Sequence, residues 1–364
     1  MQYFAILFYL FLIFFLLMIA LFVHHIYYLK KLFIQKKLFE LLINSPIFST
    51  ITIIELSKHI FRQSSLLKQQ LIQDILSCNI SSLLKHLKDK SLKNQLRIIT
   101  SGEPIKIMRD KSPLSQILNS QAYINSFEYD KAIHILNNLN DKSKSPYLAA
   151  LKLLSDAQIS AYNGDLLNAS VWSIQAIHLF HQKHALFEEG LAYFTLGKIY
   201  HAGDFNDSAY FILQHAHHIF RHLSSHHKNA EVLGSLGLMT AEECRFDEAE
   251  KFFSQALSET SFTENKTLFN LIICQQALLD ITQNSPSQAL SRISNINHST
   301  TKDSTQALIF DIKAQAHLAL NNWQQAKTFA MKSHNLYKKL NNQTAAAEIK
   351  SIADFAHKKL AQEL

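Results

Sequence analysis

Histidine is the residue type whose number and spacing could support chemistry in this sequence. Ten of the nineteen histidines fall between His178 and His227. His218, His222 and His226 follow one another at intervals of four, so on a helix they would share one face. Two histidines at this spacing can chelate zinc, nickel or copper, and imidazoles can respond to pH near 6.5. A helix face that is merely solvated can have the same spacing. The sequence therefore leaves open metal binding, a response to pH and a solvated face without a function.

Other reactive residue types lack the neighbours that catalysis needs. Cys78, Cys244 and Cys274 are scattered and odd in number, with no CxxC pair, so neither a zinc ribbon nor a redox pair is predicted. The phosphate-binding patterns GxGxxG and GxxxxGKS/T are absent, as is the metalloprotease pattern HExxH. No serine or cysteine lies in a recognisable nucleophile motif. We therefore expect no enzymatic activity, no cofactor and no bound metal.

Small residues recur periodically through the C-terminal two-thirds of the chain. Residues 191–219 contain Gly197, then Tyr200 one helical turn later, and a Gly-Asp-Phe turn follows at Gly203. At steps of about 40 residues the same register yields six alanines, which are Ala132, Ala169, Ala209, Ala249, Ala289 and Ala326. A second position of the register, seven residues after the first, is occupied in turn by Leu139, Ala176, Ala216, Ala256, Ile296 and Ser333. Because small side chains let two helices approach closely, the period predicts stacked helix pairs.

The period resembles that of the tetratricopeptide (TPR) repeats, which have an aromatic residue, Leu-Gly and Tyr in the first helix and two spaced alanines in the second. The residues that match are Tyr193, Leu196, Gly197, Tyr200, Ala209, Leu213 and Ala216. The resemblance implies an α-solenoid of six TPR-like helix-turn-helix repeats over residues 113–340, with a capping helix over 341–364. A step longer than the ~34 residues of ordinary TPRs implies longer helices or loops. Only seven glycines and five prolines occur, which also favours helices.

The TPR resemblance also implies where a partner would bind, because first helices line the concave groove of a solenoid. Carried over position by position, the groove residues are Gln158, Tyr162, Phe194, Lys198, His201, Leu238, Glu242 and Leu278. This mixed, largely apolar surface suits an extended or helical peptide. Only Lys198 matches the clamp with which some TPR domains hold an acidic C-terminus, so that partner is not implied. The same register places His178 and His218 on the convex, solvated side.

An uncharged apolar run from Tyr3 to Val23 begins the sequence. Twenty-one residues at ~1.5 Å each cover about 30 Å, the thickness of a bilayer's hydrocarbon core. We predict a transmembrane anchor over residues 1–28 that contacts the lipid bilayer through residues 3–23. A cleavable signal peptide is the alternative, but no positive n-region and no small-residue cleavage site is present. Lysines follow the run and none precedes it, so the positive-inside rule predicts a single-pass membrane protein with its repeats on the cytoplasmic side.

A basic helical region is predicted between the anchor and the repeats, over residues 29–112. Residues 24–110 carry 14 Lys and Arg against 6 Asp and Glu, whereas residues 111–364 carry 22 against 23. Anionic lipid headgroups would explain basic residues at this place, with contacts by Lys30, Lys31, Lys36 and Lys37. A solvated basic face explains them equally well. No aromatic-basic motif of nucleic-acid binding is present, so we expect no nucleic-acid partner.

These features predict an all-α protein, with an N-terminal transmembrane helix followed by an α-solenoid of TPR-like helix-turn-helix repeats. The function that we expect is a membrane-anchored adaptor or scaffold that binds a protein or peptide in the groove of the solenoid. Two alternatives stay open: a histidine-rich regulator that responds to metal or pH, and a structural subunit of a membrane complex.

Overall fold

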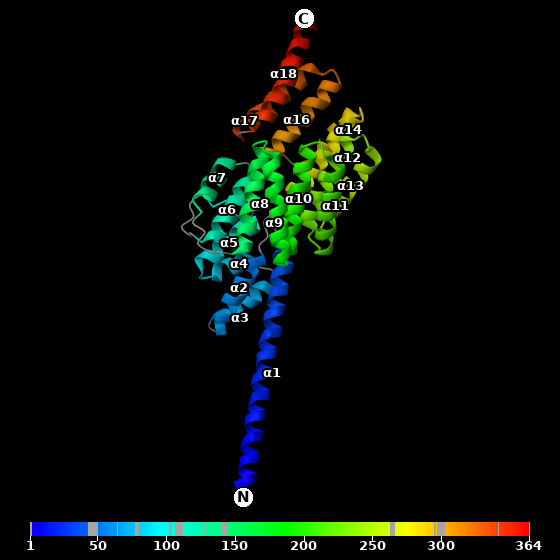
Figure 1. The fold of residues 1–364 in the computed structure, drawn as a ribbon. Coiled ribbons are helices and arrows are strands. Elements are labelled where there is room, and N and C mark those ends of the chain that lie inside the picture. The colour runs from blue at the N-terminus through cyan, green and yellow to red at the C-terminus, as the bar shows by residue number, and fades with distance from the viewer. Residues whose placement is uncertain are drawn as a thin grey trace. The chain divides into compact units, whose positions relative to one another are not determined.

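The fold is that of a computed structural model of the chain. It describes residues 2–42, 50–63, 65–76, 80–101, 104–105, 112–126, 128–139, 145–262, 266–294, 296, 303–340 and 342–363. Within these ranges every regular element is an α-helix, and Figure 1 labels most of the helices in chain order. The chain divides into two compact units, one of residues 1–43 and 49–97 and the other of residues 44–48 and 98–364. The prediction of an all-α chain is confirmed.

The first unit is built from the helices α1 (Gln2–Leu42), α2 (Thr50–Arg62), α3 (Ser65–Leu76), α4 (Ile80–His86) and most of α5 (Lys90–Ser101). The last turns of α1 bury Ile34, Leu38 and Leu42, and α1 contacts both α2 and α3. The side-chain amide of Gln35 in α1 also donates a hydrogen bond to the hydroxyl of Ser57 in α2, over 3.0 Å. The C-terminal part of α1 is therefore a helix of a protein core.

The predicted transmembrane helix, and with it the prediction of a single-pass membrane protein, is wrong. In the part of the chain that the structure describes, no helix is long and apolar enough to cross a membrane. Side chains of α1 are described at Met18 and from Leu21 onward. This part carries Lys30, Lys31, Lys36 and Lys37, whereas a spanning helix needs about 20 predominantly apolar residues. Most of the predicted span, residues 3–17, 19 and 20, has side chains outside the described residues.

Among the lysines of α1, Lys30 and Lys36 are exposed, whereas Lys31 and Lys37 are half-buried. The ammonium group of Lys37 lies 2.6 Å from the Glu40 carboxylate, and that of Lys36 lies 4.0 Å from it. Exposed pairs within one helix contribute little to stability. Contact of these lysines with anionic lipid stays a prediction.

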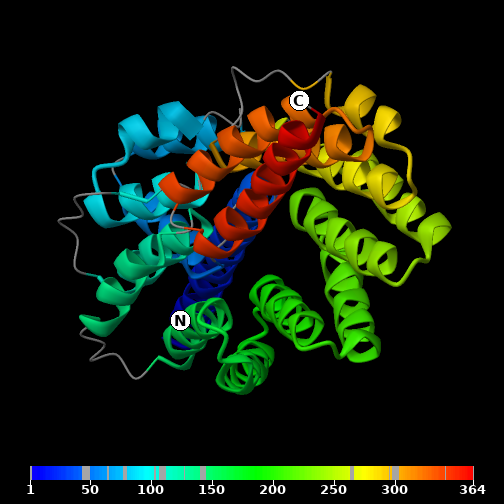
Figure 2. The same ribbon diagram turned by 90° about the horizontal axis from the view of Figure 1, so that it is seen from above.

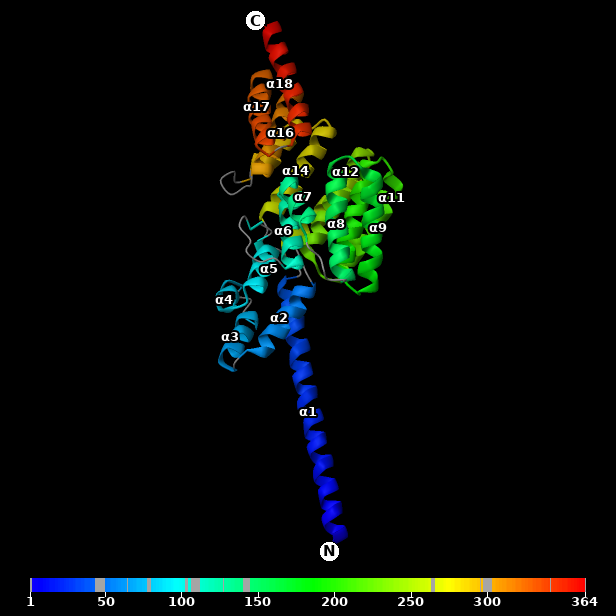
Figure 3. The same ribbon diagram turned by 60° about the vertical axis from the view of Figure 1, so that its left-hand side comes forward.

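The second unit is a stack of helix pairs. Its first helices are α6 (Pro113–Asn125), α8 (Pro146–Tyr162), α10 (Leu186–Ala202), α12 (His226–Glu242), α14 (Lys266–Thr282) and α16 (Asp303–Ala319). Their second helices are α7 (Tyr129–Asn137), α9 (Leu166–Gln182), α11 (Asn206–His222), α13 (Phe246–Thr260), α15 (Pro286–Ser294) and α17 (Trp323–Lys339), and α18 (Gln343–Glu363) follows. Successive helices contact one another from α8 to α18, and α16, α17 and α18 lie side by side in Figure 3. The chain is therefore a helical repeat protein. The predicted domain boundaries stay predictions.

The six alanines of the predicted register are all fully buried: Ala132, Ala169, Ala209, Ala249, Ala289 and Ala326. A Cβ atom added to Gly197 of α10 would lie 2.7 Å from a methyl carbon of Leu213 in α11. At the equivalent place of the next pair, a Cβ on Gly237 would lie 2.6 Å from the ring of Phe253. The two helices of a pair approach so closely here that only hydrogen fits, which confirms the reason given for the period.

From the α8–α9 pair to the α16–α17 pair, the turn inside each pair contains one residue in the left-handed conformation. These residues, with φ between 58° and 82°, are Gly164, Asp204, Cys244, Asn284 and Asn321. After α10, for example, the backbone N–H of Phe205 donates to the carbonyl of Tyr200 over 2.9 Å, as in a Schellman motif. Gly203 has φ of −97°, so Asp204 and not the glycine takes the left-handed position of the Gly-Asp-Phe turn.

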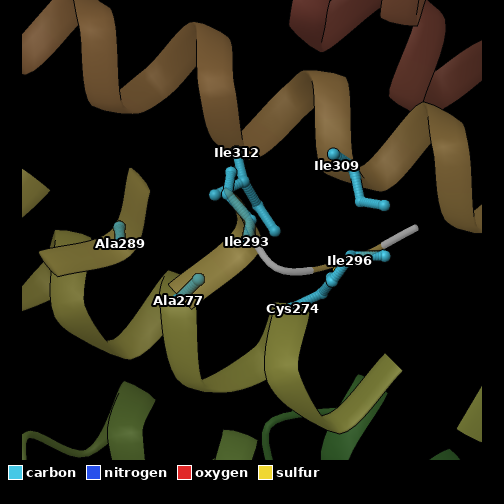
Figure 4. Packing of buried hydrophobic residues seen from close by; sticks show 7 residues of the cluster. All are labelled: Cys274, Ala277, Ala289, Ile293, Ile296, Ile309 and Ile312. Atoms are coloured by element: carbon cyan, nitrogen blue, oxygen red, sulfur yellow. The ribbon is translucent and has the colours of Figure 1, made fainter. Parts of the chain in front are cut away.

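The core continues between pairs. Figure 4 shows Cys274 and Ala277 of α14, Ala289 and Ile293 of α15, Ile296, and Ile309 and Ile312 of α16 gathered in one buried cluster. Three helices of two successive pairs thus share one layer of apolar side chains. Seen from above, the pairs from α8 to α15 follow one another along an arc (Figure 2). Stacking of this kind carries the core from one pair to the next.

Candidate partner-binding face

The first helices form one layer of the second unit. Contacts smaller than those within the pairs join each first helix to the next: α6 to α8, α8 to α10, α10 to α12, α12 to α14 and α14 to α16. Among the described helices, no contacts of similar extent join one second helix to another. We call the exposed side of this first-helix layer the inner face. All eight predicted groove residues belong to α8, α10, α12 or α14.

At the N-terminal end of the first-helix layer, a ladder of mostly buried polar side chains links three helices. The amide of Gln121 in α6 donates to the hydroxyl of Ser155 over 2.9 Å and to the amide oxygen of Gln158 over 3.3 Å, both in α8. Gln158 in turn donates to the hydroxyl of Thr195 in α10 over 3.4 Å. Gln158 is half-buried, so its main role in this structure is to join neighbouring helices.

Lys198 of α10 combines exposure with a desolvated charge. Its side chain reaches solvent, and its ammonium nitrogen lies 5.6 Å from the ring centroid of half-buried Phe194 one turn earlier. The pKa of Lys198 is lowered because surrounding protein atoms displace water, and Lys228 adds to this effect while Glu231 opposes it. Within the described part of the chain, Lys198 forms no ion pair shorter than 4.0 Å. A cation that is both accessible and poorly hydrated is suited to binding an incoming polar group.

Beside Lys198 lies a charged cluster of α12 that the sequence analysis missed. The carboxylate of Glu231 accepts hydrogen bonds from Lys228 over 2.9 and 3.0 Å and lies 3.2 Å from the ring of His227. Burial opposes ionisation of Glu231, but Lys228, His227 and Lys198 outweigh it and lower its pKa. Burial lowers the pKa of His227 to about 4. His227 is therefore neutral at pH 7, and with Lys198 the cluster carries a net positive charge.

Two further predicted groove residues meet each other. His201 of α10 and Glu242 of α12 lie 2.8 Å apart, ring nitrogen to carboxylate oxygen, and the glutamate side chain stays 64% exposed. They come from successive first helices, so the pair links two repeats across the inner face. The repeat register brings such residues together because each first helix contacts the next.

The apolar members of the predicted groove are only partly accessible. Tyr162 at the end of α8 is 50% exposed and stacks on Tyr129 of α7, with ring centroids 3.7 Å apart. Leu238 is half-buried, and Leu278 packs against the core cluster of α14 to α16. The structure thus groups Phe194 with Lys198 in the middle of the layer. It leaves Tyr162 at one end of α8.

Several histidines of the histidine-rich region have protein partners. His181 lies 3.2 Å from Glu189, and His226 lies 2.6 Å from Glu259. In the described ranges no group of three or more His, Cys, Asp or Glu side chains could hold a metal ion. Each of these histidines instead joins one helix to the next or to its neighbour in the pair.

The two cysteines that the structure describes are unpaired. Cys244 is exposed and Cys274 is buried, and both thiols are free. Burial raises the pKa of the Cys274 thiol to about 12, so at neutral pH it remains protonated. The third cysteine of the sequence, Cys78, lies outside the described residues.

Comparison with known proteins gives a limited result. No family model matches the chain, and no curated protein matches its sequence. Among solved structures, it is similar to a Rap protein complexed with competence and sporulation factor, at 13% identity and a TM-score of 0.47, with 86% of this chain and 94% of that chain covered. It is also similar to the apo form of RapI (10% identity, 82% and 98% covered, TM-score 0.43) and to aspartyl phosphate phosphatase F from Bacillus subtilis (11% identity, 90% and 91% covered, TM-score 0.43). At such scores none of these structures carries an argument about what this chain does.

Proposed function

We propose that the chain is a TPR-like scaffold that binds a protein or peptide partner on its inner face and catalyses no reaction. The observation that carries the proposal is the pairing of Lys198 with Phe194. An ammonium group that has already lost much of its hydration gives up less water when a partner arrives, so a contact with it gains more. Lysine and aromatic side chains side by side can hold a polar and an apolar group of one peptide.

The repeat architecture supports the same function. The six register alanines and two interhelical glycines are used for stacking, which leaves exposed positions of the first helices free to vary. Position 158 of α8 and its equivalents in the next three pairs are Gln158, Lys198, Leu238 and Leu278. Such a row offers one cation flanked by a polar and two apolar side chains. An extended or helical peptide with apolar residues on either side of a hydrogen-bond acceptor would fit it.

Selection of displayed random peptides on the full chain tests the proposal. Peptides that bind the parent should lose about tenfold or more in affinity when Lys198 is replaced in Lys198→Glu, because a hot-spot contact is worth ~1.4 kcal/mol or more. Lys251→Glu is the matched control, since Lys251 is an exposed lysine of the second helix α13. Selected peptides that bind both variants as tightly as the parent would show that the inner face is not the binding site.

A further inference from the structure

A second surface, formed by α16 and α17, combines stacked rings with two lysines. We call it the α16–α17 surface, and its residues are Phe310, Lys313 and His317 of α16 and Phe329 and Lys332 of α17. The ring of Phe329 is stacked with that of Phe310, at 6.1 Å between centroids and 19° between planes. It is also stacked with the imidazole of His317, at 5.5 Å and 9°. One ring of α17 therefore contacts two rings that are two turns apart on α16.

Both lysines of this surface lie over its rings. The ammonium nitrogens of Lys313 and Lys332 are each 5.5 Å from the centroid of Phe329, and that of Lys332 is 5.6 Å from the centroid of Phe310. The pKa of Lys313 is lowered by burial and further by the charge of Lys332. Two cations thus share one aromatic platform and repel each other. Contact with the rings compensates this repulsion in part.

The preceding helix pair carries other residue types at the same positions. One repeat earlier, the places of Lys313, His317 and Phe329 are taken by Gln276, Asp280 and Arg292. There the guanidinium of Arg292 donates to the Asp280 carboxylate over 2.6 Å and lies 3.7 Å from Glu250. In the α14–α15 pair these positions therefore hold an ion pair. The five residues of the α16–α17 surface include two lysines and no acidic residue.

His317 adds an unsatisfied polar atom to this surface. Its Nδ1 is buried and, within the described ranges, has no hydrogen-bond partner. Burial lowers the pKa of His317, and the charge of Lys313 lowers it further, so the ring is neutral at pH 7. A buried ring nitrogen without a partner is uncommon in proteins. A bound group with a donor or acceptor could satisfy it.

The corresponding face of an earlier pair is closed by packing. In α12 and α13 the same positions hold Leu233, Leu236, Thr240 and Phe252, none more than 9% exposed. On α16 and α17 the residues Phe310, Lys313, His317 and Phe329 are each only half-buried, and Lys332 is exposed. The second helix of the pair before them, α15, has nine residues, whereas α9 and α11 have seventeen. The stack therefore leaves a cationic aromatic surface accessible at this place.

From this arrangement we infer that the α16–α17 surface binds a short acidic segment of a partner polypeptide, with carboxylates against Lys313 and Lys332 and an aromatic or apolar side chain against the ring stack. Charge complementarity selects an anion. Residues 111–364 carry 22 basic against 23 acidic residues, so the unit as a whole does not attract a long polyanion. Nucleic acid needs many phosphate contacts to bind, whereas two lysines match two carboxylates.

Fluorescence anisotropy with the full chain tests the inference directly. The probe is a fluorescein-labelled synthetic heptapeptide with phenylalanine at its centre and glutamates on both sides, and its matched counterpart has glutamine in place of every glutamate. We expect the glutamate peptide to bind and the glutamine peptide to bind at least about tenfold more weakly, because the charge pairs are lost. Lys332→Glu should weaken binding of the glutamate peptide by about tenfold or more, whereas Lys332→Arg should retain it.

Two control variants separate this site from general electrostatics and from the inner face. Lys338→Glu changes another exposed lysine of α17 and should leave binding of the glutamate peptide unchanged. Lys198→Glu should also leave it unchanged, so failure of one proposal does not imply failure of the other. The inference is overturned if the glutamate peptide does not bind, or if Lys338→Glu weakens it as much as Lys332→Glu. Tighter binding of an oligothymidylate than of the glutamate peptide would overturn it as well.

Discussion

Replacement of Gly237 by alanine tests the close approach of α12 and α13. The added methyl carbon would lie 2.6 Å from Cε1 and 2.8 Å from Cδ1 of Phe253, whereas carbons in contact are separated by ~3.5–4.0 Å. Phe253 is fully buried, so its ring cannot swing into solvent. Overpacking costs ~1–3 kcal/mol, and a glycine-to-alanine change inside a helix regains ~1 kcal/mol. We expect Gly237→Ala to destabilise this pair by about 1 kcal/mol.

Whether Gly237→Ala destabilises or stabilises the α12–α13 pair decides whether the two helices approach this closely. In a helix without a close neighbour, the same substitution would stabilise by ~1 kcal/mol. Native-state hydrogen exchange of the α12 and α13 amides is the suitable assay, because pairs of a solenoid can unfold separately. Gly237→Ala in a Phe253→Ala background removes the clash, so there its effect, relative to Phe253→Ala alone, should be neutral or stabilising. Slower exchange in the single variant Gly237→Ala would refute the packing argument.

Four other changes have defined outcomes. Asp204→Gly should increase the free energy of unfolding measured in urea by up to ~1 kcal/mol, because glycine adopts the left-handed conformation without strain. His227→Gln should make the free energy of unfolding less dependent on pH between ~6.5 and ~4. In the parent, the pKa of His227 in the folded state is about 4, below its unfolded value, so the folded state loses about 3 kcal/mol of stability as pH falls through this window. Arg292→Met should destabilise by roughly 2–4 kcal/mol in urea titrations, because Asp280 stays buried without its partner. Lys198→Leu should raise the urea midpoint while it weakens peptide binding, since a desolvated cation is replaced by an apolar side chain.

The stacking of helix pairs could be predicted from the sequence because it depends on side-chain size. Gly197 and Gly237 lie where a Cβ atom would meet a buried side chain less than 3.0 Å away. Residue size at such places is fixed by local geometry, so it repeats with the period. The left-handed turn residues were harder to predict from the sequence. Glycine is the residue usually expected in this conformation, but Asp204 and Cys244 occupy it here.

The N-terminal helix shows the opposite case. An apolar run of about 20 residues predicts a spanning helix from its own composition, whereas α1 continues without a break to Leu42. Its described part carries four lysines, while Ile34 and Leu38 pack into a protein core. Composition over a window of residues cannot indicate where a helix ends. The described side chains of α1 lie mainly in its continuation beyond the apolar run, and this continuation packs into the core of the first unit.

The charged cluster on α12 was missed because its residues lie at positions that earlier pairs fill with other types. Glu231 and Lys228 are three residues apart, a spacing that also describes any solvated helix face. What distinguishes them is burial, which the sequence does not state. Lys198 could be selected from the TPR register, but its desolvation follows from neighbours on α12.

Positions that depart from the repeat are therefore more informative about binding than those that keep it. If stacking were the only requirement, the place of Lys198 could be filled by leucine, as at Leu238 and Leu278, with lower desolvation cost. The same holds for Lys313, whose equivalent in α12 is the fully buried Leu236. Both lysines carry lowered pKa values caused first by burial, so each is held in a setting that disfavours its charge. Such a cost to the free protein is offset when an anionic or polar partner arrives, which is the role that we propose for both lysines.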